Sequence, residues 1–476
     1  MASHLRALLH VLQGSIERIE KECQRSGVDF PVLDEPYTPD SESIRLTPAV
    51  QEASILITAA AYQLIAVVQQ PQMHVFNAGC SYYLSASLRA AIETNAVEIL
   101  REAGPKGLHV TKIAAQSNVD HMKLSRIMRF LATYHIFKEI SPDVYANNRL
   151  SSICDTGKPV AELLDRPLEK YDGTNGIAAL IGHCTDEDYK GAGCITEHLT
   201  NPETAFEDSP ERSPMMQAFG CDVGVWNWLE KPSNQLRLQR FGVAMDGVSR
   251  MQPQDSILKG FDWGYLPDDS IVIDVGGGIG VSSITLVKAH PHIRCIIQDR
   301  PSVVAQGKKH CEQVLPHALV SGRIQYIGIS LIEMLEHDFF QVQRQLDASV
   351  FLLKQITHDW SDKYVTRILR RLRDASTATT KLVLIDCIIP HSCSAVEVDI
   401  PGANSPAPPA PLLANMGAAN ASPYFTDLSM YVHFNGQDRT LAHIVGLLNE
   451  AGWAVERVHP GDSIGNYLPQ IIAKPA

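Results

Sequence analysis

The second half of the chain alternates short runs of apolar, often β-branched residues with longer segments of helical pattern, and this alternation constrains the fold most. The runs are SIVIDV, IRCIIQD, GRIQYIGI, DASVFLLKQI and KLVLIDCII. Strands that alternate with helices form βαβ units, in which helices cover both faces of a parallel sheet. The closing WAVERVHP and LPQIIAKP predict a terminal pair of strands. We therefore predict an α/β fold, a Rossmann-like doubly wound domain over residues 255–476.

The first half, residues 1–254, is mainly helical in pattern and contains a segment typical of a winged helix at about 85–150. There a short helix leads to Asp120, a suitable N-cap for a second amphipathic helix, and two short strands follow around a Ser-Pro-Asp turn. Such a segment serves DNA recognition or dimerisation. The net charge of −12 argues against binding a phosphate backbone, which needs clustered Lys and Arg. We expect a dimerisation domain and no nucleic-acid partner, with a winged-helix regulator as the alternative.

The N-terminus and the cysteines indicate the compartment. Leu5, Leu8 and Leu12 recur at helical spacing among charges, without the basic start and cleavage site of a signal peptide. The apolar segment 53–68 is shorter than the ~20 residues that span a bilayer, and it predicts a buried helix without membrane contact. The 10 cysteines form no CxxC pair and no zinc-like spacing. We expect reduced, mostly buried thiols, a cytoplasmic protein and no metal.

A glycine-rich loop follows the first of these strands, in IVIDVGGGIGVSS. Gly276, Gly278 and Gly280 form G-x-G-x-G at the entry of a helix, where residues without Cβ let a ligand approach the backbone. The dinucleotide fingerprint requires G-x-G-x-x-G, which this spacing does not match. Asp299 closes the next strand, where a carboxylate would reach the ribose hydroxyls of an adenosine. The pair of features favours S-adenosylmethionine as the cofactor.

The stretch THDWSD contains the candidate base. His358 follows the fourth strand, at the carboxyl edge where open α/β sheets bind their ligands, and Ser361 is a suitable N-cap for the next helix. Asp386 reaches the same edge after the fifth strand, and Asp438 lies in a loop that could approach from the side. A histidine held by a carboxylate has a fixed tautomer. With an unperturbed pKa of ~6.5 it can take a proton from a phenol of pKa ~10 at neutral pH.

Several motifs, in this order, carry a family resemblance: DVGGGIG, QDRP, HDFF, LLKQITHDWSD and NGQDRT. They resemble the catalytic domain of S-adenosylmethionine-dependent O-methyltransferases of the caffeate and flavonoid type, and the fungal secondary-metabolism branch in particular. The resemblance covers nearly the whole chain. It implies a class I methyltransferase fold, a homodimer formed through the N-terminal domain, and a small aromatic or polyketide-like substrate with a hydroxyl group.

The resemblance also implies the roles of individual residues. The catalytic group would be His358 as general base, with Asp386 and Asp438 as the carboxylates that hold it; the sequence does not say which of the two orients the imidazole. The cofactor would contact Gly276, Gly278, Gly280, Asp299, Asp338, Phe339 and Lys354. Members of the family usually have glutamate at one or both supporting positions, where this chain has aspartate. Alternatively, Phe339 is core, Lys354 a surface charge, and Asp359 a turn residue.

Two further segments bear on the acceptor. SPMMQAFGCDVGVWNWL (213–229) supplies Met216 and Phe219 as a possible wall for a planar acceptor, although Met and aromatic residues equally fill cores. The Pro-rich loop 394–424 falls where the family lines its acceptor pocket. The hypothesis is methylation of a phenolic hydroxyl. The alternative with the same cofactor is a rearrangement that S-adenosylmethionine catalyses electrostatically without methyl transfer.

Overall fold

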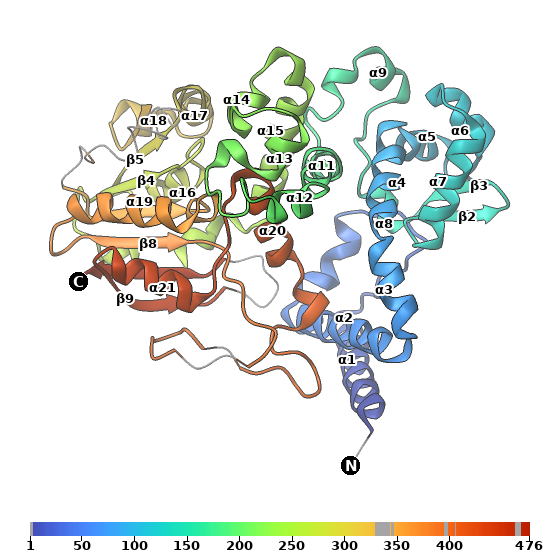
Figure 1. Cartoon of the computed structure of the whole chain (residues 1–476), viewed down its shortest axis with the longest axis horizontal. Helices are drawn as coiled ribbons and strands as arrows, with labels where there is room; N and C mark the ends of the chain where they lie inside the picture. The colour runs from blue at the N-terminus through green and yellow to red at the C-terminus, as the bar shows by residue number, and fades with distance from the viewer. Residues whose placement is uncertain (1–2, 329–342, 344–346, 395–397, 405, 462–467) are drawn as a thin grey trace.

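The computed structural model describes residues 3–328, 343, 347–394, 398–404, 406–461 and 468–476. A layer of helices from the first half of the chain stands beside a sheet domain from the second half (Figure 1). Asp338 and Phe339, and the insert SLIEMLE that precedes them, lie outside the described residues.

The sheet has seven described strands in the order β6-β5-β4-β7-β8-β10-β9. They are β4 (Ile271–Val275), β5 (Arg294–Asp299), β6 (Ile324–Gly328), β7 (Val350–Lys354), β8 (Lys381–Ile385), β9 (Trp453–His459) and β10 (Gln470–Pro475). β6, β5, β4, β7 and β8 pair in parallel, whereas β10 runs antiparallel to both β8 and β9. The α/β class and the terminal strand pair are therefore confirmed.

Successive residues of the central strands point to opposite faces of the sheet and enter two separate cores. Ile273 and Phe351 pack against α19 (Asp362–Asp374) and α21 (Leu441–Glu450). Val272 and Leu352 pack on the other face against α16 (Val281–Ala289) and α17 (Pro301–Val314). The near-continuous apolar runs of the sequence follow from this double coverage. α18 (Pro316–Val320) completes the helices around β6.

The first half supplies helices and one small sheet. Its helices are α1 (His4–Ser26), α2 (Pro48–Val68), α3 (Pro71–Gly79), α4 (Tyr82–Glu93), α5 (Ala96–Ala103), α6 (Val110–Ser117), α7 (His121–Thr133), α8 (Arg149–Ser152), α9 (Val160–Asp165), α10 (Ile177–His183), α11 (Tyr189–Ala192), α12 (Ile195–Thr200), α13 (Pro214–Ala218), α14 (Val225–Leu229) and α15 (Gln235–Met251). The small sheet is β1 (Leu108–His109), β2 (Phe137–Ser141) and β3 (Val144–Asn147), in the order β1-β3-β2.

The predicted helix, turn, helix and hairpin are present as α6, α7, β2 and β3. Asp120 is the N-cap of α7, and its carboxylate accepts the Lys123 N–H at 2.9 Å, as expected. The assignment of this segment as a winged helix stays a prediction, and so does the boundary at residues 254 and 255.

Two expectations about burial are wrong. The helix that contains residues 53–68 is α2, and only 28% of its most apolar 18-residue window is buried. Among the described residues it is the one helix that is long and apolar enough to cross a membrane by length and composition. Ile65 is 44% and Val68 61% exposed, because α2 packs mainly on α1 and leaves its other face open. Of the 10 cysteines, all without disulfide partners, only Cys154, Cys295 and Cys311 are buried.

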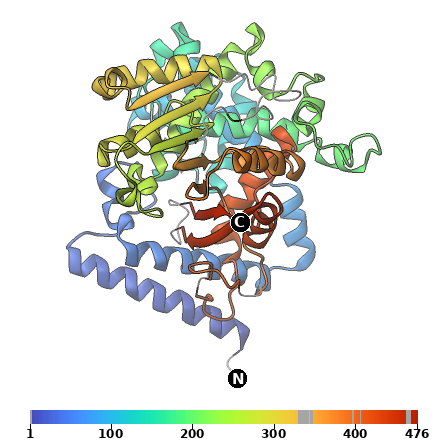
Figure 2. The same cartoon turned by 90° about the vertical axis from the view of Figure 1, so that its left-hand side faces the viewer.

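The Pro-rich loop lies against this helical layer. Its 3-10 turn η10 (Gly417–Asn420) packs on α2, and the Gln63 side-chain amide donates to the Pro411 carbonyl oxygen at 2.9 Å. In Figure 2, α1 and α2 run together across the lower part of the molecule, and the loop crosses in front of them below the C-terminal strands. The loop then enters α20 (Ser422–Phe434), which crosses toward the sheet edge.

Candidate active site

The glycine loop turns from β4 into α16 with all three predicted glycines at positive φ: +69° at Gly276, +58° at Gly278 and +89° at Gly280. A Cβ at Gly280 would lie 2.6 Å from the Tyr326 hydroxyl oxygen, so this position needs glycine for packing as well. A Cβ at Gly278 would meet nothing within 4 Å. Gly278 therefore presents open backbone, which is the arrangement that a closely approaching ligand requires.

Asp299 lies against this loop from the end of β5. Its Oδ2 accepts the Gly278 N–H at 2.8 Å, and its Oδ1 accepts the Arg300 N–H at 2.7 Å. The backbone N–H of Gly276 donates to the Gln298 carbonyl oxygen at 2.8 Å and ties the same two segments together. Burial raises the pKa of Asp299, although these two N–H groups oppose the rise. The carboxylate has lone pairs left for hydroxyl donors, so the loop and Asp299 fit an adenosine ribose.

Asp274 and Lys354 form a charged pair beneath the loop. Asp274 is buried in β4, where it accepts the Ser283 hydroxyl at 2.6 Å, and burial raises its pKa to about 6. Lys354 ends β7 and is partly buried; burial lowers its pKa against the opposing charge of Asp274. Lys354 is thus partly buried at the end of β7, and its contact with the cofactor stays a prediction.

His358 lies in the 3-10 turn η9 (Thr357–Asp359), buried at the carboxyl edge of the sheet. Its Nδ1 is 3.3 Å from Asp438 Oδ1 and 3.8 Å from Asp386 Oδ1, so both predicted carboxylates face one ring nitrogen. Asp438 is at hydrogen-bond distance and Asp386 is not. On the opposite side of the ring, Nε2 is 3.6 Å from Asp359 Oδ1. The structure thus brings together the residues that the sequence could only assign to separate loops.

The two supporting carboxylates differ in what else they hold. Asp386 Oδ2 accepts the Thr357 N–H at 3.1 Å and also the Thr357 hydroxyl, so it anchors the turn that carries the histidine. Asp438 accepts no such backbone donor from η9, and its own N–H donates to Asp427 of α20 at 2.9 Å. Asp386 therefore fixes the backbone of the turn, whereas Asp438 is the better placed of the two to orient the ring.

These carboxylates reverse the usual effect of burial on a histidine. Burial lowers the pKa of His358, but Asp386, Asp438 and Asp359 together raise it to about 10. The sequence had suggested an ordinary value near 6.5. The imidazole is consequently protonated at neutral pH in the ligand-free protein. It becomes a base only after that proton is lost.

Asp359, next to His358 in the chain, points its carboxylate at Nε2 of the imidazole, and burial raises its pKa to about 6. Two further features of this site were missed by sequence reasoning. Arg439 is buried and donates to the carbonyl oxygens of Thr357 at 2.8 Å and Trp360 at 2.7 Å. A Cβ at Gly436 would overlap the His358 carbonyl oxygen. Arg439 and Gly436 both belong to the sequence NGQDR, in which an Asn-Gly turn precedes a charged pair, and this pattern could have indicated them.

Ser361 and the two side chains predicted to line the acceptor site, Met216 and Phe219, have other contacts in the structure. Ser361 occupies the N-cap position of α19, but its hydroxyl donates to Asp208 at 3.3 Å and does not cap the helix. Met216 is fully buried in an apolar cluster that includes Val432, and Phe219 packs at the edge of that cluster, 4.4 Å from the Trp228 ring. The lining of the acceptor site by these side chains stays a prediction.

His358, Asp386 and Asp438 offer ligand atoms within 4.8 Å of one another, a spacing that a divalent cation could also occupy. Displacement at a methyl carbon requires no metal, because a sulfonium is already a good leaving group. A histidine between carboxylates serves that chemistry as a base with a fixed tautomer.

Comparison with known families gives two matches. The model of the O-methyltransferase domain matches residues 203–399, and that of the O-methyltransferase dimerisation domain matches residues 76–156. Together they span the segments that contain α4 to α8 and the first five strands of the large sheet.

Curated fungal proteins are similar over most or all of their length. The chain is 41% identical to 4-O-methyltransferase 1 of Phanerochaete chrysosporium, covering 100% of both chains. It is 28% identical to 3-O-methyltransferase 2 of the same fungus, over 95% of this chain and 94% of that protein.

Among solved structures, mitomycin 7-O-methyltransferase MmcR superposes with a TM-score of 0.60 at 20% identity, over 88% of this chain and 100% of that one. A structure titled as a pericyclic reaction enzyme superposes with a TM-score of 0.64 at 17% identity, over 90% of this chain and 95% of that one. At these identities the likeness concerns the fold alone, and it confirms the predicted arrangement of a helical N-terminal domain and a Rossmann-like sheet domain.

Proposed function

The chain belongs to the family of S-adenosylmethionine-dependent O-methyltransferases, and we propose that it methylates a phenolic hydroxyl of a small aromatic or polyketide-like metabolite with His358 as general base. The observation that carries the proposal is the position of His358. It lies buried at the carboxyl edge of the sheet, between carboxylates on both ring nitrogens. Full-length similarity to a 4-O-methyltransferase supports the reaction type.

The cofactor site would be formed by the glycine loop and Asp299. Gly278 leaves space at its backbone, and Asp299 retains lone pairs for ribose hydroxyls. Lys354 and Asp274 would lie close to the cofactor at the ends of the central strands. When bound, S-adenosylmethionine supplies an electrophilic methyl group on a sulfonium. Asp338 and Phe339 keep their proposed place near the adenine.

The residues of this chain would move one proton. His358 Nε2 would take the proton of the acceptor hydroxyl, and Asp438 and Asp386 at Nδ1 would stabilise the positive charge that forms on the ring. A base with a pKa of about 10 is matched to a phenol of pKa ~10, so the transfer is nearly balanced. The activity should accordingly increase toward alkaline pH, as His358 loses its resting proton.

We further propose a homodimer formed through the N-terminal helices. The dimerisation-domain match supports it, and so does the open apolar face of α2. The unpaired cysteines favour a reducing compartment such as the cytoplasm. The alternative, a rearrangement without methyl transfer, has only the shared fold of a pericyclic enzyme in its favour.

The test is incubation with methyl-labelled S-adenosylmethionine and a panel of phenols, read by mass. We expect a labelled product and an equal amount of S-adenosylhomocysteine. Label in no phenol of the panel would contradict the proposed substrate class. A changed product without S-adenosylhomocysteine would establish the rearrangement instead.

A further inference from the structure

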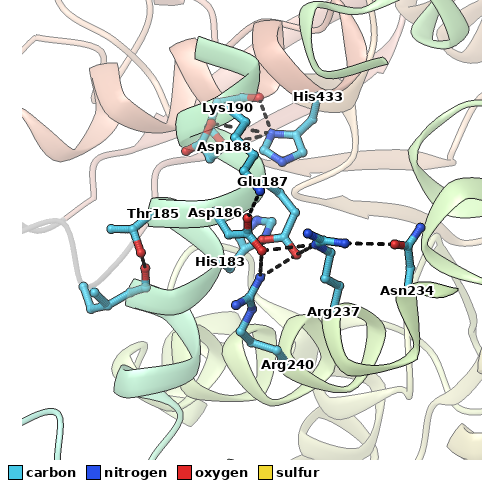
Figure 3. Close-up of polar contacts among 12 residues, drawn as sticks. His183, Thr185, Asp186, Glu187, Asp188, Lys190, Asn234, Arg237, Arg240 and His433 are labelled. Atoms are coloured by element: carbon cyan, nitrogen blue, oxygen red, sulfur yellow. Dashed lines mark hydrogen bonds and ion pairs between the residues drawn. The ribbon is translucent and has the colours of Figure 1, made fainter. Parts of the chain in front are cut away.

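Three consecutive acidic residues, Asp186, Glu187 and Asp188, lie in a π-helical turn between α10 and α11, some distance along the chain from any residue of the site. The turn, η3 (Cys184–Asp188), is shown in Figure 3. Asp186 is 2% exposed and Glu187 is fully buried. π-turns are rare, occur mostly as single turns within α-helices, and are frequent at functional sites. Buried carboxylates at such a turn need partners, and these come from two directions.

The first group of partners consists of cationic side chains. One terminal nitrogen of Arg240 in α15 donates to Asp186 Oδ2 and to both Glu187 oxygens, each at 2.8 Å. Further cations surround Asp186: Arg89 of α4 at 2.8 Å, Lys190 at 2.6 Å and Arg237 at 3.1 Å. These charges hold the pKa of Asp186 well below its usual range despite burial. The turn is therefore fixed to the helical layer.

The second group of partners lies on α20 and faces Asp188. Burial raises the pKa of Asp188, the Ser429 side chain opposes this rise, and Asp188 Oδ1 is 3.8 Å from His433 Nδ1. His433 Nδ1–H donates to the Ser429 carbonyl oxygen at 2.8 Å, and its ring lies 5.3 Å from that of His183. His183 Nδ1 in turn is 3.3 Å from Glu187. Asp186 points toward the arginines and Asp188 points toward α20 (Figure 3).

α20 leads directly to the candidate base. It ends at Phe434, and the Gly436 N–H closes its last turn by donating to Met430 O at 3.2 Å. Gly436 passes so close to the His358 carbonyl oxygen that no side chain would fit. Asp438 follows two residues later, and its N–H donates to Asp427, also on α20. The position of the Asp438 carboxylate against His358 thus depends on where α20 lies.

We propose that the π-turn positions α20, and through it Asp438, for catalysis, with Asp188 as the positioning residue that joins the turn to the helix. The proposal rests on His358 as general base. Apolar contacts already bury the C-terminal end of α20, since Val432 and Phe434 pack with Met215 and Trp228. Such contacts are non-directional, whereas polar contacts with a carboxylate on a fixed turn, here Asp188 beside His433, constrain the rotation and height of a helix.

The test compares Asp188→Ala with Asp188→Asn by the pH dependence of kcat/KM. His358 faces the carboxylates of Asp359, Asp386 and Asp438, with Arg439 behind them. When α20 shifts, Asp438 moves away from Nδ1 and the pKa of His358 falls. The rise of kcat/KM toward alkaline pH, here called the alkaline limb, then moves to lower pH. For Asp188→Ala we expect a shift of about one pH unit and a loss of about tenfold or more in kcat, with the KM for S-adenosylmethionine unchanged. Asp188→Asn, which keeps a polar group of nearly the same shape beside α20, should restore both.

The matched control is Glu98→Ala. Glu98 is a buried carboxylate, whereas the Asp188 side chain is 23% exposed; Glu98 accepts the Thr156 hydroxyl at 2.8 Å in the helical layer, away from α20. This variant should lower the melting temperature but leave the limb in place. A folded Asp188→Ala enzyme with the wild-type limb would overturn the proposal. If that variant does not fold, Ser429→Ala decides: a shift in the same direction supports the proposal, and an unmoved limb overturns it.

The two proposals fail in different ways. If His358 is not the base, His358→Ala retains the limb, whatever Asp188→Ala does. If His358 is the base but the π-turn has only a structural role, His358→Ala abolishes the limb while Asp188→Ala leaves it unmoved.

Discussion

Replacing Asp386 by asparagine should lower the pKa of His358 and move the activity profile to lower pH. The amide has nearly the shape of the carboxylate and can still accept the Thr357 N–H at 3.1 Å, so the turn stays anchored. What disappears is a negative charge 3.8 Å from Nδ1. At an effective dielectric constant of ~20 such a pair interacts by about 4 kcal/mol, or roughly three pKa units. Water that enters the site screens part of this energy, and we expect a fall of one to three units from about 10.

The assay is kcat/KM for a single phenol between neutral and alkaline pH, in wild type and Asp386→Asn. The wild-type limb should lie in the alkaline range, and the variant should be relatively more active near neutrality. Asp269→Asn is the control, because it makes the same charge change at a side chain that is 78% exposed. A limb that stays in place or moves to higher pH in Asp386→Asn would refute the assignment of the raised pKa to these carboxylates.

Further predictions concern the cofactor and the assembly. Asp299→Ala should weaken S-adenosylmethionine binding by at least tenfold in calorimetry, because it removes the ribose acceptor and the Gly278 contact at 2.8 Å. Gly278→Ala should weaken S-adenosylmethionine binding, because the added Cβ enters the open space at the loop, and should lower the melting temperature only by the strain of its positive φ. Gly280→Ala should mainly lower the melting temperature, since its Cβ overlaps Tyr326. Ile65→Glu, on the open face of α2, should convert a dimer to a monomer in light scattering; a monomeric wild type would contradict the proposed interface.

Local patterns were sufficient for the residues at the carboxyl edge of the sheet. The glycine loop, Asp299, His358 and Asp386 each lie at or just after the end of an apolar strand, and parallel strands bring their carboxyl ends to one edge. β4 and β7 are adjacent parallel strands in which Val272 pairs with Val350 and Val275 with Leu353, so their carboxyl ends form a continuous edge. Periodicity alone thus fixes which side chains meet there.

Contacts between distant segments were beyond the sequence. Asp438 is 80 residues from His358 and reaches it only because α20 packs across the sheet edge. The raised pKa of His358 likewise needs carboxylates from three separate segments, and no local pattern reports their distances. The exposed face of α2 was read as core, because an apolar helix has the same composition whether its own chain or a second copy covers it.

The most direct test of the account is a single-turnover measurement of methyl transfer by His358→Ala, with S-adenosylmethionine and phenol both saturating. Calorimetry on the same variant reports cofactor affinity. Loss of the base should slow the chemical step by about 10² to 10⁴-fold, while the dissociation constant of S-adenosylmethionine changes little, because the glycine loop and Asp299 are untouched. Methyl transfer at close to the wild-type rate in this variant would contradict the central claim.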